Sequence, residues 1–129
     1  MHVAGTYDGE TVRLYVDGVL AGEQAYDGGI PHSLQPLRLG SAEGNYPWRG
    51  GLDEVRLWDI ARSGEEIAAS YETAVSADSE GLVGLWRFDE TGPVALDPSA
   101  NGLDAAVVLS PARDTQLYRV EAQRGERLA

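Results

Sequence analysis

The sequence predicts an all-β protein made of antiparallel sheets, with one short helix. Two Asp-Gly pairs, Asp8-Gly9 and Asp17-Gly18, separate segments in which apolar and polar residues alternate. Such pairs supply the positive φ angles that tight hairpin turns need. The 129 residues also include 16 glycines and six prolines, which is typical of many turns. A helix is expected only near residues 64–71.

The first three expected strands form a β-meander, because each Asp-Gly turn reverses the chain between two neighbouring strands. In the second strand, Val12, Leu14 and Val16 share one face, while Arg13 and Tyr15 point to the other. The three strands span His2 to Tyr7, Thr11 to Val16, and Val19 to Gln24.

The segment 50–71 combines a strand with the helix. Leu52 to Asp59 contains β-branched, aliphatic and aromatic residues that suit a pleated surface. Ser63 followed by Glu66 is a capping box, in which the serine accepts a backbone N–H and the glutamate reaches back to the cap. The helical face that follows is made of Ile67, Ala68 and Tyr71.

Three parts of the chain resemble a laminin-G-like domain of the concanavalin A-like lectin and glucanase superfamily. Residues 50–71 are similar to its closing pattern, G-x-I-D-E-V-R-I-[YW] followed by S-x-x-E-I. Residues 2–18 are similar to H-V-A-x-T-Y-D-G-x-x-x-x-L-Y-V-D-G. Residues 81–104 resemble the opening pattern, G-L-V-G-Y-W-x-F-D-E-x-x-G and then D-x-S-x-N-G-x-D-G. The resemblance implies an antiparallel β-sandwich of concanavalin A-like jelly-roll type.

The order of these parts predicts an incomplete sandwich, because the family's closing half comes first and its middle strands are missing. The resemblance implies that Gly81 to Phe88 pairs antiparallel with Leu52 to Asp59, as the first and last strands of relatives do. Thr115 to Ala122 is a further candidate strand. The expected organisation is a closing half over 1–72, a linker over 73–80, opening strands over 81–111 and an unassigned tail over 112–129.

Charge and composition exclude several classes of function. The formal net charge is −11, whereas binding to nucleic acid or to an anionic membrane needs a basic surface. Cysteine is absent, so disulfides do not contribute. No apolar run reaches the ~18 residues that would span a bilayer. All ten basic residues are arginine, which hints at a GC-rich genome.

The carboxylates suggest calcium rather than catalysis. Asp53, Asp97 and Asn101 are candidate calcium ligands, because calcium binds carboxylate and carbonyl oxygens and the superfamily often holds such ions. The alternative for Asp97-Pro98-Ser99 is a turn closed by an Asx hydrogen bond. A glycosidase pair is disfavoured, because Asp53 and Glu54 are adjacent and would point to opposite faces of a strand.

Tyr46 and Trp48 are candidate ligand-binding residues, since flat rings suit sugar faces; the alternative is that Trp48 fills the sandwich edge. The expected function is a non-catalytic module that binds a glycan or an extracellular protein, within a secreted or surface bacterial protein. A structural spacer in a tandem array and a glycoside hydrolase-associated module are the alternatives. Neither nucleic acid nor membrane insertion is expected, but self-association through open sheet edges is.

Overall fold

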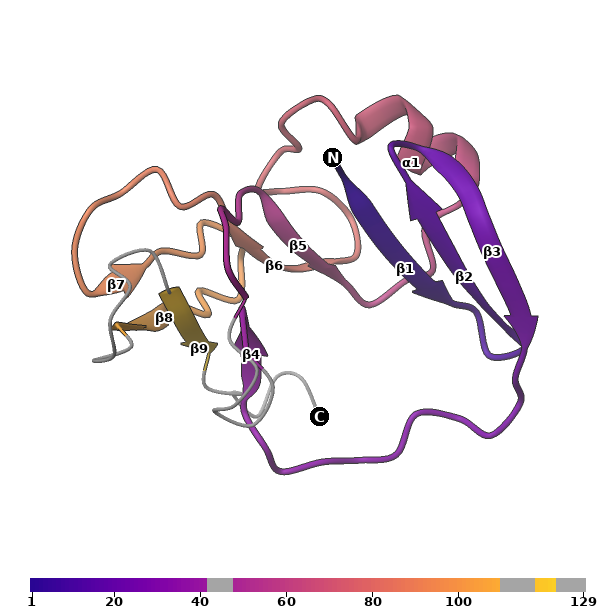
Figure 1. Cartoon of the computed structure of the whole chain (residues 1–129), viewed down its shortest axis with the longest axis horizontal. Helices are drawn as coiled ribbons and strands as arrows, with labels where there is room; N and C mark the ends of the chain where they lie inside the picture. The colour runs from indigo at the N-terminus through magenta and orange to yellow at the C-terminus, as the bar shows by residue number, and fades with distance from the viewer. Residues whose placement is uncertain (42–47, 110–117, 123–129) are drawn as a thin grey trace. The chain divides into compact units, whose positions relative to one another are not determined.

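The computed structural model describes residues 1–41, 48–109 and 118–122, and this part of the chain forms nine strands and one helix (Figure 1). The chain divides into two compact units, each made of two separate stretches of sequence. The first unit contains Met1–His32 and Trp58–Gly81; the second contains Ser33–Leu57 and Leu82–Ala129.

The first unit is built on the predicted β-meander. Strands β1 (Val3–Tyr7), β2 (Thr11–Val16) and β3 (Val19–Ala25) form one antiparallel sheet in that order. The register shifts between Leu14 and Tyr15, which places a bulge in the β2–β3 pair. Both Asp-Gly turns lie where the sequence predicts them.

Helix α1 (Gly64–Ser70) lies beside the Tyr15 face of this sheet. Tyr15 is buried, and a Cβ atom added to Gly64 would lie 3.2 Å from its ring. On the opposite face, Val12 and Leu14 remain 43% and 45% exposed. The face of β2 that carries Val12 and Leu14 has the stronger apolar pattern, yet it is the more exposed of the two faces.

The capping box at the start of α1 is confirmed. The Ser63 hydroxyl accepts the Glu66 N–H at 3.2 Å, and the Glu66 carboxylate accepts the Ser63 N–H at 3.0 Å. Ile67 is buried, and the Tyr71 ring lies against Gly18 in the second hairpin turn. These contacts fix the predicted apolar face of the helix on the meander.

The second unit contains a four-stranded sheet in the order β4-β9-β8-β7, with β4 spanning Leu37–Leu39 and β7 spanning Val94–Ala95. Strand β9 (Tyr118–Ala122) falls within the predicted 115–122 strand and lies between β4 and β8 (Ala105–Leu109). This sheet joins residues from both ends of the unit, which short-range patterns did not predict.

Strands β5 (Val55–Trp58) and β6 (Leu82–Trp86) form a separate pair. Where β5 ends and β6 begins, the Asp59 N–H donates to the Gly81 carbonyl at 2.9 Å, as an antiparallel pair requires. All five residues of β6 are buried, which suits an apolar strand that is covered on both faces. The predicted pairing of these two strands is confirmed.

Trp86 lies at the centre of the hydrophobic core of the second unit. Its side chain is fully buried, and its indole N–H donates to the Leu103 carbonyl at 2.9 Å. This bond satisfies the one polar group that the burial of a tryptophan brings with it. The other buried members of the core are Val83, Ala95, Leu103 and Ala105.

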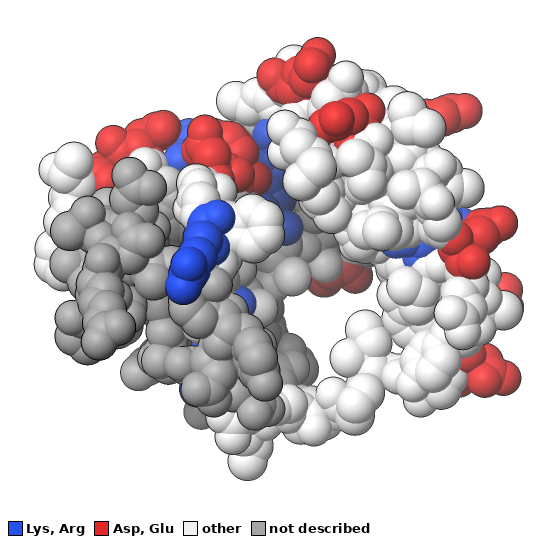
Figure 2. Space-filling model, viewed as in Figure 1, with Lys and Arg blue, Asp and Glu red and all other residues white. Residues whose placement is uncertain are grey.

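Neither compact unit corresponds to one of the predicted segments 1–72 and 81–111, because the residues of 1–72 are divided between the two units. Those segment boundaries stay a prediction. No helix in the described part of the chain is long and apolar enough to span a membrane. Figure 2 shows more acidic than basic side chains on the visible face, in keeping with the net charge of −11.

Candidate functional site

The Asp97 carboxylate is the most heavily bonded side chain of the candidate site. Asp97 is only 5% exposed. Its Oδ1 accepts the N–H groups of Leu85 at 3.0 Å and Ser99 at 2.9 Å. Its Oδ2 accepts the Leu103 N–H at 2.8 Å and lies 3.0 Å from the Ser99 hydroxyl. Donors from strand β6 and from the segment 99–103 therefore converge on one buried carboxylate.

Ser99 and Asn101 extend this network to strand β6. The Asn101 side-chain amide donates to the Val83 carbonyl at 2.8 Å. The Ser99 hydroxyl lies 3.1 Å from the same carbonyl, so its single proton is shared between Val83 and Asp97. We call residues 97–103 the Asp97 loop.

This geometry bears on the calcium prediction. An ionised carboxylate has about four lone-pair positions, and all four of Asp97 already face a donor. The Ser99 N–H bond is the Asx hydrogen bond of the alternative interpretation. Within residues 1–41, 48–109 and 118–122, no three His, Asp or Glu side chains gather where a metal ion could be held. Calcium binding at Asp53, Asp97 and Asn101 stays an untested prediction from the sequence, and the bonds that Asp97 already accepts argue against it.

Trp48 is held by its own backbone surroundings. Its backbone N–H donates to the Gly40 carbonyl at 2.7 Å, and its indole N–H donates to the Gly51 carbonyl at 3.2 Å. The residue is nevertheless 49% exposed. Trp48 therefore presents a fixed aromatic ring to solvent. Tyr46, the other candidate ligand-binding residue, lies outside the described residues.

Glu54 differs from its predicted position. It has a φ of +49° and precedes β5, so it does not alternate with Asp53 within a strand. Its carboxylate lies 3.5 Å from the Arg56 guanidinium and 3.7 Å from that of Arg87. The strand argument against a carboxylate pair thus does not apply here, and Glu54 is instead engaged by two arginines.

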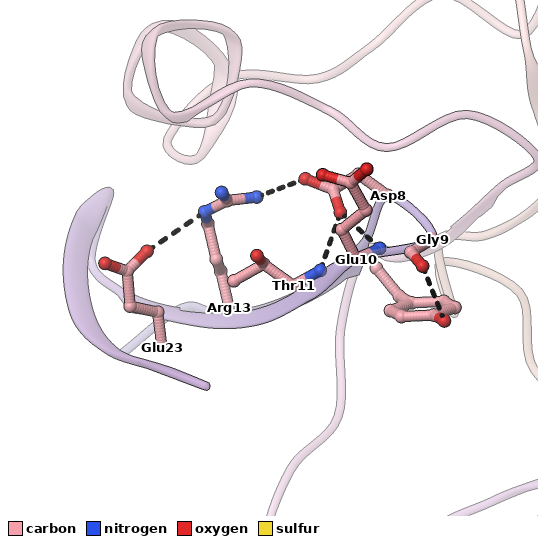
Figure 3. Close-up of polar contacts among 7 residues, drawn as sticks. Asp8, Gly9, Glu10, Thr11, Arg13 and Glu23 are labelled. Carbon is pink, nitrogen blue, oxygen red and sulfur yellow. Dashed lines mark hydrogen bonds and ion pairs between the residues drawn. The ribbon is translucent and has the colours of Figure 1, made fainter. Parts of the chain in front are cut away.

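Asp8 closes the first hairpin turn with its side chain (Figure 3). Its carboxylate accepts the N–H groups of Glu10 and Thr11 and pairs with the Arg13 guanidinium at 2.6 Å. The hydrogen bond from Arg13, followed by the two backbone bonds, holds the pKa of Asp8 well below its usual range. Arg13 also pairs with Glu23 at 3.2 Å, which links the turn to β3.

The roles of Leu85 and Leu103 in the Asp97 network are not apparent from residue type. The D-x-S-x-N pattern at 97–101 indicates the turn. The Leu85 and Leu103 donors are backbone groups, which every non-proline residue carries. Only the fold shows that these two groups face the same carboxylate.

Part of the chain is similar in sequence to known proteins. Pappalysin-1 from Mus musculus is 36% identical over 78 residues, which is 57% of this chain and 5% of that protein. Pappalysin-1 from Homo sapiens is 38% identical over 80 residues, again 57% of this chain and 5% of that protein. The chain thus spans about a twentieth of these curated relatives. No solved structure matches it significantly.

The match to a family model covers the part of the chain that carries the meander and the capped helix. The Laminin_G_3 model, described as the concanavalin A-like lectin/glucanases superfamily, matches residues 1–68. The same residues include both Asp-Gly hairpins, strand β5 and most of α1. With more than half of its length matched, the chain belongs to the laminin-G-like family of the concanavalin A-like lectin/glucanase superfamily.

Proposed function

We propose that the chain contributes a non-catalytic recognition domain to an extracellular or cell-surface protein, and that it binds a glycan. Domains of this family commonly bind glycans or proteins. The observation that carries the proposal is the half-exposed ring of Trp48, anchored through its own N–H to the Gly51 carbonyl. A bacterial source for that protein stays a prediction.

An anchored aromatic ring suits a sugar-binding surface for two reasons. Its flat apolar face can cover the C–H groups of a sugar ring. The bond from the indole N–H to the Gly51 carbonyl restrains the ring, and the bond from the Trp48 backbone N–H to the Gly40 carbonyl holds the backbone that carries it, so less side-chain freedom is lost on binding. Because the indole N–H is used internally, the contact would rely on the ring face.

The test is a glycan array probed with the full chain, in the presence and in the absence of calcium. We expect Trp48→Ala to weaken binding to the glycans that the wild type recognises by about fivefold or more, and Trp48→Phe to retain part of it. Tyr26→Ala is the matched control, because Tyr26 is 47% exposed but lies in the first unit.

Equal binding by the wild type and Trp48→Ala would contradict the assignment of the ring. An array on which no glycan binds would favour the other class of function, a structural spacer without its own ligand. Requirement for calcium is read from the same experiment, because the array is probed with and without the ion.

A further inference from the structure

Strand β6 has two edges with different neighbours. On one edge it pairs with β5. Val83 and Leu85 are two residues apart in the strand, so their backbone groups point to a common edge. The bonds that the structure gives to the Val83 carbonyl and the Leu85 N–H come from the Asp97 loop. The loop therefore occupies backbone groups along one edge of β6, at Val83 and Leu85.

Side chains at this edge occupy the positions that a further strand would occupy. The Asp97 carboxylate accepts the Leu85 N–H at 3.0 Å, as a strand carbonyl would. The Asn101 amide donates to the Val83 carbonyl at 2.8 Å, as a strand N–H would. The Asp97 side chain thus supplies one acceptor and the Asn101 side chain one donor, to backbone groups that a neighbouring β-strand would otherwise bond.

The loop is also fixed to the strand that it covers. The Leu103 N–H donates to Asp97 Oδ2 at 2.8 Å, and the Leu103 carbonyl accepts the buried Trp86 indole N–H at 2.9 Å. The Asp97 N–H donates to Asp104 Oδ1 at 2.9 Å. These bonds hold the loop in place before any partner approaches.

We propose that Asp97, Ser99 and Asn101 form an edge cap that closes β6 to strand addition by another chain. An unpaired strand edge is a template for pairing. Strand β6 reads Leu-Val-Gly-Leu-Trp, an uncharged apolar segment of the kind that aggregates when its edge is free. Side chains that bond to the Leu85 N–H and the Val83 carbonyl use the backbone groups of this edge without presenting a further strand edge. Strand pairing therefore stops at the loop.

The cap gives the candidate calcium ligands Asp97 and Asn101 a function that needs no ion. It also removes β6 from the open edges through which self-association is expected. By contrast, β3 is exposed at all seven positions and pairs within its sheet only with β2. In the second unit side chains of a loop bond to an edge of β6, whereas in the first unit the outer strand β3 is exposed.

The test compares full-length Asn101→Ala and Asp97→Asn with the control Asp104→Asn. Asn101→Ala removes one hydrogen-bond donor from a half-buried position. Because this is the milder change, we expect this variant to fold even if Asp97→Asn does not. Asp104 accepts a bond from the loop backbone but is exposed, so its variant perturbs the loop without uncovering β6. Circular dichroism melts measure the stability of each variant.

Three measurements report on the edge itself, all made well below the melting transition. Amide exchange by nuclear magnetic resonance follows the Leu85 N–H, which we expect to exchange about tenfold faster in Asp97→Asn. Sedimentation velocity and thioflavin T fluorescence follow strand addition. We expect Asn101→Ala and Asp97→Asn, which weaken the cap, to associate more than the wild type at equal concentration. Asp104→Asn should associate as the wild type does.

A faster Leu85 amide without increased association would show that the freed edge does not recruit strands, which would overturn the proposal. The proposal would also be overturned if Asp104→Asn and Asn101→Ala associated equally and the extent of association depended only on the melting temperature of each variant. That result would assign the effect to lost stability rather than to an opened edge.

Discussion

Asp8 illustrates how a single side chain ties the first hairpin together. Its carboxylate binds two backbone N–H groups of its own turn and the Arg13 guanidinium, which in turn pairs with Glu23 on the next strand. All three partners stabilise the ionised form, so the pKa of Asp8 is lower in the folded chain than in the unfolded chain.

The stabilising effect of Asp8 should therefore depend on pH. Because the folded pKa is depressed, this contribution is present above the unfolded pKa of ~3.9 and is lost as the pH falls through the folded pKa. We expect Asp8→Asn to melt at a lower temperature than the wild type at pH 7, with the difference narrowing below about pH 4. Melting curves recorded from pH 2 to pH 7 measure it. A difference in melting temperature between the wild type and Asp8→Asn that stays constant from pH 2 to pH 7 would contradict this role of the Asp8 carboxylate.

At Asp97 the prediction concerns calcium. An ion would have to displace donors that already face all four lone-pair positions of the carboxylate. We therefore expect millimolar calcium and EDTA to leave the melting temperature unchanged. A ligand at a hundredfold excess over its Kd would add about 2.7 kcal/mol to the free energy of unfolding. A calcium-induced rise that is lost in Asp97→Ala would show that the ion replaces these donors.

At the scale of elements, α1 depends on its capping box and on its contact with the meander. The helix has seven residues, which is too short to be stable alone. We expect Ser63→Ala to lower the free energy of unfolding by about 1 kcal/mol, because the Glu66 N–H loses its acceptor.

The control for the cap is Ser70→Ala in the last turn of the same helix, where alanine is the better helix former. Urea unfolding followed by far-ultraviolet circular dichroism measures both variants. A Ser70→Ala variant as unstable as Ser63→Ala would show that serine hydroxyls contribute there in some way other than capping.

At the scale of the whole molecule, the open face of the meander is the feature that most affects behaviour in solution. Val3, Val12, Leu14 and Val19 are 54%, 43%, 45% and 69% exposed. We expect the isolated chain to self-associate, and a Val12→Thr, Leu14→Thr double variant to sediment as smaller species. Val94→Thr is the control, since Val94 is 42% exposed in the second unit. A wild type that sediments as a monomer and melts in one sharp transition would contradict this prediction.

The sequence predicts local structure better than it predicts burial. Asp-Gly turns and the Ser63–Glu66 box act within a few residues, so the hairpins and the helix start are where they are expected. Which face of β2 is covered depends on where α1 packs, and α1 selects Tyr15 rather than the apolar Val12 face. The pairing of β9 with β4 and β8 depends on residues far apart in the chain, which no short pattern encodes.

The same rule applies to the candidate site. The turn at Asp97 follows from residue types, because aspartate and serine bond to nearby backbone groups. Its connection to β6 does not, because the Leu85 N–H comes from a strand twelve residues earlier. The ring of Trp48 could be identified as a candidate from its type, whereas its exposure follows from the loop that holds it.

The position of β9 between β4 and β8 has a consequence for protein synthesis. Leu37 pairs with Ala122, and the ribosome, at ~5–20 residues per second, needs roughly 4 to 17 s to travel from one to the other. During that interval β4 emerges without its neighbour, while the three strands of the meander, which pair with the next segment along the chain, can already close. The nascent chain thus acquires its hairpins early and completes its larger sheet only after residue 122 has left the exit tunnel.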